Sequence, residues 1–103
     1  MEMCLTGEAF LKAEEALTLG LVSKVCKPDE LVDEAMKTAE KIASLSRPVV
    51  MMCKEAVNQS YETGLDDGLR FERRIFHSTF AVKDRKEGME AFAAKRKADW
   101  KHE

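Results

Sequence analysis

The chain has 103 residues, enough for one small domain that buries about two-thirds of its unfolded surface. Hydrophobic residues make up 45% and charged residues 35% of the chain, with 5 Gly and 2 Pro, which favours a helical globular protein over disorder or an all-β fold. The net charge of −2 gives no general attraction to nucleic acid or anionic membranes, and no apolar run approaches the roughly 20 residues of a membrane span.

The stretch from Leu5 to Val25 is predicted to form a turn, a helix, a glycine stop and a short strand. Apolar residues recur at helical spacing behind Glu14 and Glu15, whose carboxylates suit the positive end of a helix dipole. Gly20 lies where the helix must end, because glycine enters the left-handed region without a steric penalty, and the residues after it favour an extended backbone. The stretch is a joint without obvious catalytic groups.

Three long helices are expected next, each with apolar residues three and four apart. They are predicted over residues 29–44, 46–61 and 65–80. Pro28 stands just before the first of these helices and Pro48 in the first turn of the second. Ser46 is the expected N-cap of the second helix, and Gly64 is expected to end it. These helices carry more apolar face than about 100 residues can enclose, so we expect either an oligomer or a monomer with adhesive apolar surface. The residues concerned are Leu31, Ile42, Val49, Val50, Met51, Met52, Ile75 and Phe76.

A last helix is expected from Arg85 to about Lys97. Asp84 and Glu87 precede and open it in a capping-box-like arrangement, in which Asp84 accepts from the Glu87 N–H and Glu87 reaches back. On a continuous helix Phe92 shares a face with the cations three and four residues later, which places an aromatic ring beside a positive charge.

The cysteines and histidines give no metal or redox motif. Cys4, Cys26 and Cys53 are odd in number and widely spaced, so no paired disulfide framework or CxxC motif is available. We expect reduced thiols in buried or half-buried positions. A nucleophile or a zinc ligand would need partners, and His77 and His102 are the only histidines. We therefore predict no metal site.

An ordered set of motifs runs through the whole chain. The motifs are LTG, AEEA and GLVSKV, then SRPVVMMCKEAVN from Ser46, FERRIFHSTFAVKDRKEGMEAF from Phe71, and the closing AAKRKADW. Together they resemble the C-terminal third of mitochondrial-type short-chain enoyl-CoA hydratase, in the crotonase superfamily. The chain departs from the family at Lys12, where Ser, Thr or Asp usually caps the helix, and in the twelve residues between Gly7 and Gly20, one more than is usual.

The resemblance implies chemistry that this chain does not carry. The family adds water to a 2-enoyl-CoA with a pair of glutamates and a pair of backbone N–H groups that hold the thioester oxygen. All of these precede the LTG segment, so no catalytic residue is assigned here, and the chain's own glutamates are expected on polar helix faces. No glycine-rich phosphate loop occurs, and no cofactor is implied.

Phe92 and Lys95 are the only site residues that the resemblance carries over. They match the positions with which the family's last helix covers the coenzyme A moiety, typically one bound to a neighbouring subunit. An aromatic ring packs on apolar parts of the ligand, and an ammonium pairs with a phosphate. In the alternative Phe92 belongs to the core and Lys95 is solvated. A basic nucleic-acid patch in KRKADWK is a third interpretation, which Asp99 and the overall acidity oppose.

We predict a mostly α fold, the helical C-terminal region of the crotonase fold, with four to five helices and at most one short strand near residues 21–25. Residues 1–103 form one domain or fragment, with a joint over 1–25 and a helical assembly region over 26–103. By resemblance, the preceding domain is a spiral of βαβ units, assembly is a homo-oligomer such as a trimer or hexamer, and the location is the mitochondrial matrix. The chain itself shows no targeting signal.

The resemblance implies the C-terminal, oligomerising and CoA-covering part of an enoyl-CoA hydratase of fatty-acid β-oxidation. The expected partners are enoyl-CoA, bound through the full-length enzyme, and copies of the same chain, with neither nucleic acid nor a membrane. One alternative is a non-catalytic helical interaction module. Another is the tail of an enoyl-CoA isomerase or a 3-hydroxyacyl-CoA hydrolase, because the discriminating residues lie upstream.

Overall fold

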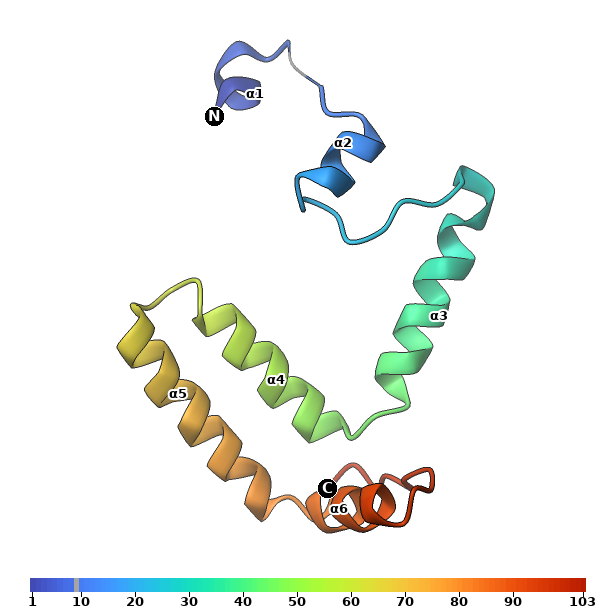
Figure 1. The fold of residues 1–103 in the computed structure, drawn as a ribbon, viewed down its shortest axis with the longest axis vertical. Helices are drawn as coiled ribbons and strands as arrows, with labels where there is room; N and C mark the ends of the chain where they lie inside the picture. The colour runs from blue at the N-terminus through green and yellow to red at the C-terminus, as the bar shows by residue number, and fades with distance from the viewer. Residues whose placement is uncertain (9) are drawn as a thin grey trace. The chain divides into compact units, whose positions relative to one another are not determined.

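A computed structural model describes residues 1–8 and 10–103. The described part is helical and contains no strand (Figure 1). In chain order its elements are α1 (Glu2–Thr6), α2 (Ala13–Thr18), the 3₁₀ turn η1 (Pro28–Glu30), α3 (Leu31–Ala43), α4 (Arg47–Gln59), α5 (Leu65–Ser78), the 3₁₀ turn η2 (Thr79–Ala81) and α6 (Asp84–Ala93). The mostly α fold class is confirmed. The short helix α1 was not predicted, since only a turn was expected there.

The chain divides into two compact units, Met1–Met36 and Lys37–Glu103. In the first unit α2 begins after Lys12, which stands at the N-cap as its place in the sequence indicates. The Lys12 N–H donates to Glu15 Oε2 at 2.9 Å, the half of a capping box that reaches back to the N-cap backbone. Lysine has no acceptor for the other half, so one backbone donor is satisfied where Ser or Thr would satisfy two.

The end of α2 follows the prediction for glycine. Gly20 has φ 75°, and its N–H donates to the Leu17 carbonyl at 3.1 Å while the Leu21 N–H donates to the Ala16 carbonyl at 2.8 Å. This pair of bonds is a Schellman motif, which satisfies two carbonyls that the helix leaves unpaired. Residues 21–25 do not form the predicted strand, because a strand needs a partner for its ladder and the described residues contain none.

The expected helix over 29–44 is confirmed as η1 followed by α3, with Pro28 in the first turn. Near its start Lys24 and Glu34 form an ion pair, and the hydrogen bond to the Glu34 carboxylate raises the pKa of Lys24. This pair ties the segment before η1 to the first turns of α3.

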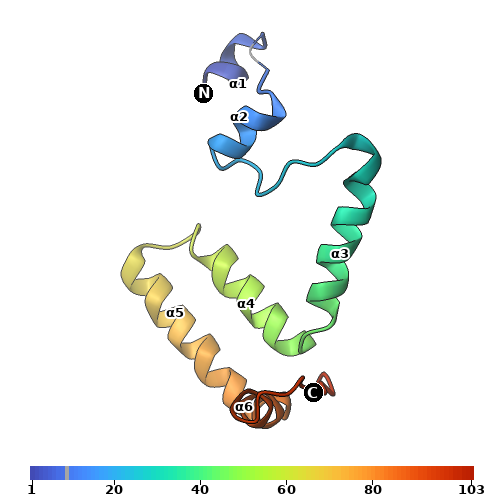
Figure 2. The same ribbon diagram turned by 45° about the vertical axis from the view of Figure 1, so that its right-hand side comes forward.

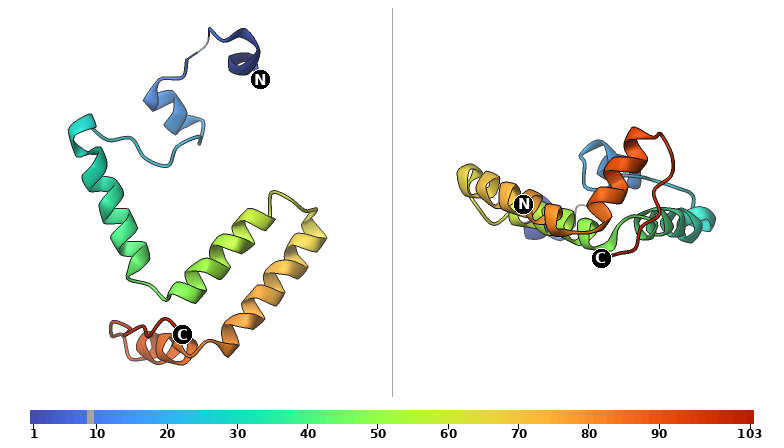
Figure 3. Two further views of the ribbon diagram at one scale, coloured as in Figure 1. Left: turned by 180° about the vertical axis from the view of Figure 1, so that it is seen from behind. Right: turned by 90° about the horizontal axis from the view of Figure 1, so that it is seen from below.

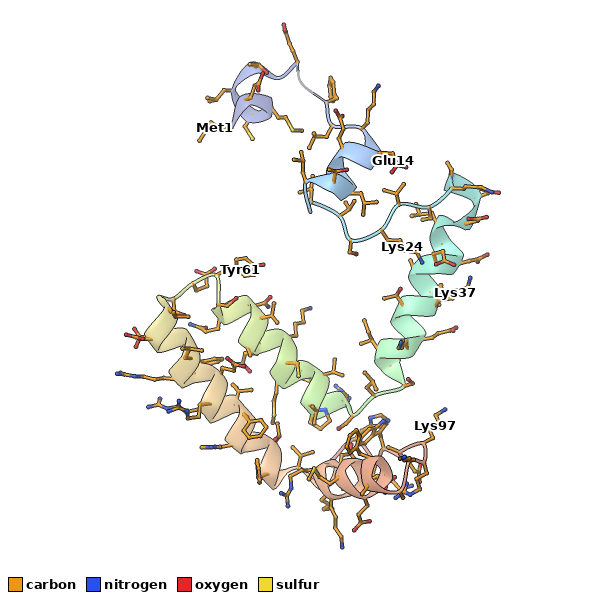
Figure 4. All side chains as sticks on the ribbon, in the orientation of Figure 1. Met1, Glu14, Lys24, Lys37, Tyr61 and Lys97 are labelled. Carbon is orange, nitrogen blue, oxygen red and sulfur yellow. The ribbon has the colours of Figure 1, made fainter. Side chains whose placement is uncertain are left out.

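In the second unit α4 and α5 form an antiparallel hairpin and lie side by side in every view (Figures 2 and 3). Tyr61 marks the turn between them and is exposed (Figure 4). The prediction that Gly64 ends α4 is wrong. Gly64 is the N-cap of α5, and α4 ends earlier, at Gln59. At the other end of α5, Phe80 meets Arg85 across a cation–π contact of 4.6 Å, which links η2 to α6.

Little apolar surface is enclosed. Among the described residues only Ala16 and Ala91 are buried apolar side chains, one in each unit. The helices are amphipathic, but their apolar faces are open. The three thiols are free, and Cys4 and Cys53 are exposed where buried or half-buried positions were expected.

Candidate functional site

The site begins where α6 ends. The helix stops at Ala93, several residues before the predicted end near Lys97. The Lys95 N–H donates to the Phe92 carbonyl at 3.1 Å and the Arg96 N–H to the Ala91 carbonyl at 3.0 Å, which is a second Schellman motif. Lys95, at φ 51°, occupies the left-handed position that glycine usually takes. Lys95 thus has a side chain at a backbone position where glycine is less strained.

Phe92 and Lys95 are brought together differently from the prediction. They do not share the face of a continuous helix, because Lys95 lies beyond its end, and their link is the backbone bond across the helix terminus. Phe92 is 87% exposed, so its ring is not buried among the described residues. Lys95 is exposed as well. The assignment of both residues to a CoA contact stays a prediction.

Asp84, in the first turn of α6, is the most buried polar residue of the region at 2% exposure. Its Oδ2 accepts from Ser46 Oγ at 2.6 Å and from the His102 N–H at 2.9 Å, and its Oδ1 accepts from the Lys101 N–H at 2.7 Å. The predicted N-cap position of Ser46 is confirmed, but the predicted capping bond between Asp84 and Glu87 is wrong. Ser46 is the N-cap of α4 but gives its hydroxyl to Asp84, and Asp84 accepts from the chain terminus instead of from Glu87.

The protonation of Asp84 follows from these partners. Burial raises its pKa, but the hydrogen bonds from Ser46 and from the Lys101 and His102 amides outweigh it, and the pKa lies below its ordinary value. An ionised carboxylate thus stands at the start of α6, where the helix dipole favours negative charge. Its negative charge is stabilised by the hydroxyl and amide donors and by the positive end of the helix dipole.

The last residues of the chain are fastened to the same place. The Arg47 N–H, at the start of α4, donates to His102 Nδ1 at 3.2 Å. The Asp84 N–H donates to the Glu103 carbonyl at 3.1 Å, and Lys83 Nζ lies 2.9 Å from Glu103 Oε2. The C-terminus accordingly lies beside α6 (Figure 1). The starts of α4 and α6 are thus joined through residues 101–103.

Glu87 lies one turn further along α6 and binds Arg96 and Asp99. Its Oε1 and Oε2 accept from Arg96 Nη1 and Nη2 at 2.6 and 2.9 Å, a bidentate pair, and Oε1 also accepts from the Asp99 N–H at 2.7 Å. The Arg96 guanidinium and the Asp99 amide lower the pKa of Glu87 to about 2. Glu87 does not reach back to form the predicted capping box.

An aromatic ring covers the adjacent glycine. A Cβ on Gly88 would lie 3.0 Å from Cη2 and 3.2 Å from Cζ3 of Trp100, so the indole packs directly on the helix backbone. We define the terminal segment as residues 95–103; Lys97 marks it in Figure 4. Sequence reasoning missed its docking on α6. The available signal was a helical glycine between a carboxylate and a later tryptophan, in the run EGMEAFAAKRKADW.

Other kinds of site find no support in the described residues. No group of three His, Cys, Asp or Glu side chains could hold a metal ion there. No helix in the described part is both long and apolar enough to cross a membrane. Of the glutamates considered for catalysis, Glu14, Glu55, Glu72 and Glu90 are exposed, as a role on polar helix faces requires.

The family model described as enoyl-CoA hydratase/isomerase matches residues 1–103. A probable enoyl-CoA hydratase of Rhizobium meliloti is 59% identical over 102 residues, which cover 99% of this chain and 39% of the relative. A probable mitochondrial enoyl-CoA hydratase of Dictyostelium discoideum is 59% identical over 100 residues, covering 97% of this chain and 36% of the relative. A crystal structure of subunit I of an enoyl-CoA hydratase from Geobacillus kaustophilus has a TM-score of 0.91 at 36% identity, covering 99% of this chain and 40% of that one.

These matches confirm the fold expected from the resemblance, the helical C-terminal region of the crotonase fold. The chain spans 39% and 36% of the two relatives' lengths. The bacterial and the mitochondrial relative match at the same identity, so the resemblance is confirmed for the family and not for the mitochondrial type.

Proposed function

The chain belongs to the enoyl-CoA hydratase/isomerase family, and from this premise we propose that it is the C-terminal part of an enoyl-CoA hydratase. The proposed reaction is the addition of water to a 2-enoyl-CoA, as in fatty-acid β-oxidation. The names of both relatives support this over the alternatives, an enoyl-CoA isomerase or a 3-hydroxyacyl-CoA hydrolase. The proposed catalytic glutamates and oxyanion donors lie outside these 103 residues.

The proposed role of this part is to cover the coenzyme A moiety and to assemble copies of the enzyme. The observation that carries it is the exposed pair at the end of α6, the 87% exposed ring of Phe92 and Lys95 held in the left-handed region. An exposed ring offers an apolar surface, and a neighbouring ammonium suits a phosphate. Backbone strain of this kind is usually retained where it serves a function.

The test needs an active enzyme. We suggest joining residues 1–103 to the preceding part of the Rhizobium relative and measuring hydration of crotonyl-CoA. Lys95→Ala should raise KM about fivefold at low salt, since a charge-assisted contact near solvent contributes about 1 kcal/mol. The effect should shrink as salt is added, because an exposed pair is screened over about 10 Å at 0.1 M. Lys97→Ala, two residues along, is the matched control.

An unchanged KM for Lys95→Ala at low salt would return that residue to a purely solvated role. The 103-residue chain alone should not hydrate crotonyl-CoA above background. Turnover by the purified chain that disappears on mutating one of its own residues would contradict the placement of the catalytic groups outside it.

The second candidate function is a non-catalytic helical interaction module, which the open apolar faces of α4 and α5 favour. The native mass of the protein in its source cells separates the two: about 11.6 kDa fits the module, and a larger polypeptide fits the tail of an enzyme. The name of the Dictyostelium relative supports a mitochondrial location and the Rhizobium relative a bacterial one. Cell fractionation with immunoblotting distinguishes these locations.

A further inference from the structure

We propose that Glu87 is a positioning residue for Lys95, and that Asp84 is a second anchor of the same terminal segment. The inference rests on the proposed function, since it concerns how the CoA-contacting cation is held. Both carboxylates lie on α6, and each receives a backbone N–H from beyond the end of the helix. Neither is assigned contact with a ligand.

The chain next to Lys95 is bound to α6. Arg96 follows Lys95 directly, and both of its terminal nitrogens bond to Glu87. Because Arg96 also donates its backbone N–H to Ala91, its backbone and its side chain are both bound to α6. Lys95 is therefore held between a helix terminus on one side and a bidentate ion pair on the other.

The terminal segment must turn back along α6, since Asp99 bonds to Glu87 and Lys101 and His102 bond to Asp84, nearer the start of the helix. A left-handed residue at the helix end makes this reversal. Lys95 takes that conformation, and the bonds at Glu87 and Asp84 hold the segment that depends on it. Loss of the Glu87 clamp should therefore release Lys95 into a range of conformations.

The two carboxylates differ in their burial and in the partners that they bind. Asp84 is buried and also holds Ser46, so its removal disturbs the start of α4 as well. Glu87 is half-buried, and its hydrogen bonds join only the terminal segment. Glu87 is thus the residue whose removal tests positioning without opening the buried cluster. Glu90, on the same helix, is the matched control, since it is exposed and lies 3.8 Å from Lys86 instead of bonding to the segment.

The experiment is a double-mutant cycle in the enzyme described above, with KM and kcat for crotonyl-CoA measured at low salt for Glu87→Ala, Lys95→Ala and the pair. We expect about a threefold rise in KM for Glu87→Ala, about fivefold for Lys95→Ala, and no further rise for the pair, because a residue that acts through Lys95 has nothing left to position. The kcat should stay within twofold. Glu90→Ala should leave KM unchanged.

A second measurement follows the segment in the 103-residue chain. Amide hydrogen exchange at Arg96 and Asp99 should accelerate at least tenfold in Glu87→Ala and not in Glu90→Ala. Multiplicative KM effects in the pair, or unchanged exchange, would overturn the positioning role while the CoA contact of Lys95 stood. An unchanged KM for Lys95→Ala would overturn both the contact and the positioning.

Discussion

Replacing Lys95 by glycine should stabilise the fold and weaken the ligand site at once. Lys95 has φ 51°, a region that costs an L-residue about 1–2 kcal/mol and costs glycine nothing. Glycine also gives the unfolded chain more conformational freedom, which lowers the free energy of unfolding by about 0.4–1 kcal/mol. The net gain for Lys95→Gly is about 0.5–1 kcal/mol, which for a domain of this size raises Tm by about 2–8 °C.

The same change removes the ammonium, so KM for the enoyl-CoA should rise about fivefold in the joined enzyme, as for Lys95→Ala. Thermal unfolding of the 103-residue chain, followed by circular dichroism at one concentration, measures the stability. Lys97→Gly is the control. Lys97 is not in the left-handed region, so the change should lower Tm or leave it unaltered. A lower Tm for Lys95→Gly would refute the strain at the end of α6, and an unchanged KM would refute the use of the side chain.

Three further outcomes follow from the site. The pKa of Glu87 is about 2 in the fold and about 4.3 in an unfolded chain, so its stabilisation is present above about pH 5 and is lost as pH falls from about 4 to 2. The pH dependence of Tm should flatten in Glu87→Gln, and an unchanged acid slope would contradict it. Gly88→Leu should displace Trp100, seen as a red shift and easier quenching of its fluorescence; an unshifted spectrum would deny the contact. Phe92→Ala should raise KM at any salt concentration. The free energy of unfolding should change by less than about 0.5 kcal/mol, because the ring is exposed. A large fall in Tm would instead indicate that Phe92 belongs to the core.

The helices could be predicted because their signals are local. Apolar spacing, Pro28 and the N-cap positions of Lys12 and Ser46 act within one or two turns, and α2 to α5 lie close to where these signals place them. The strand over residues 21–25 was predicted wrongly, because β-propensity describes one segment alone. A strand also needs a neighbouring strand for its backbone hydrogen bonds, and propensity does not show whether one is present. Phe92 shows a similar limit. A helical stripe does not indicate whether anything covers it.

The carboxylate contacts were mispredicted for a related reason. A capping box between Asp84 and Glu87 is the local solution, three residues apart, but both side chains bond to partners far along the chain. Ser46 is 38 residues from Asp84, and Asp99 is 12 from Glu87. Once the terminal segment docks, its unpaired amides and Arg96 compete for the carboxylates, and the long-range bonds prevail. A local sequence pattern does not indicate which of these partners a carboxylate will bind.

The open apolar faces lead to a last prediction, on association. In the second unit Val57 and Phe76 are each 59% exposed, and Ala91 is the only buried apolar residue described there. Apolar surface of this kind marks an interface. At micromolar concentration we expect the chain to form oligomers by light scattering and to bind a hydrophobic dye. Val57→Glu should shift it toward the monomer, because a charge cannot be buried in an apolar contact without a partner.

The control for this change is Asn58→Asp, which adds the same charge to α4 at a polar, exposed position. If both variants dissociate equally, net charge and not the apolar face governs assembly. If the unmodified chain is a monodisperse monomer at high concentration and binds no dye, then the faces of α4 and α5 are not interfaces in this chain. Their exposure would then be a property of a stable helical hairpin that needs no cover.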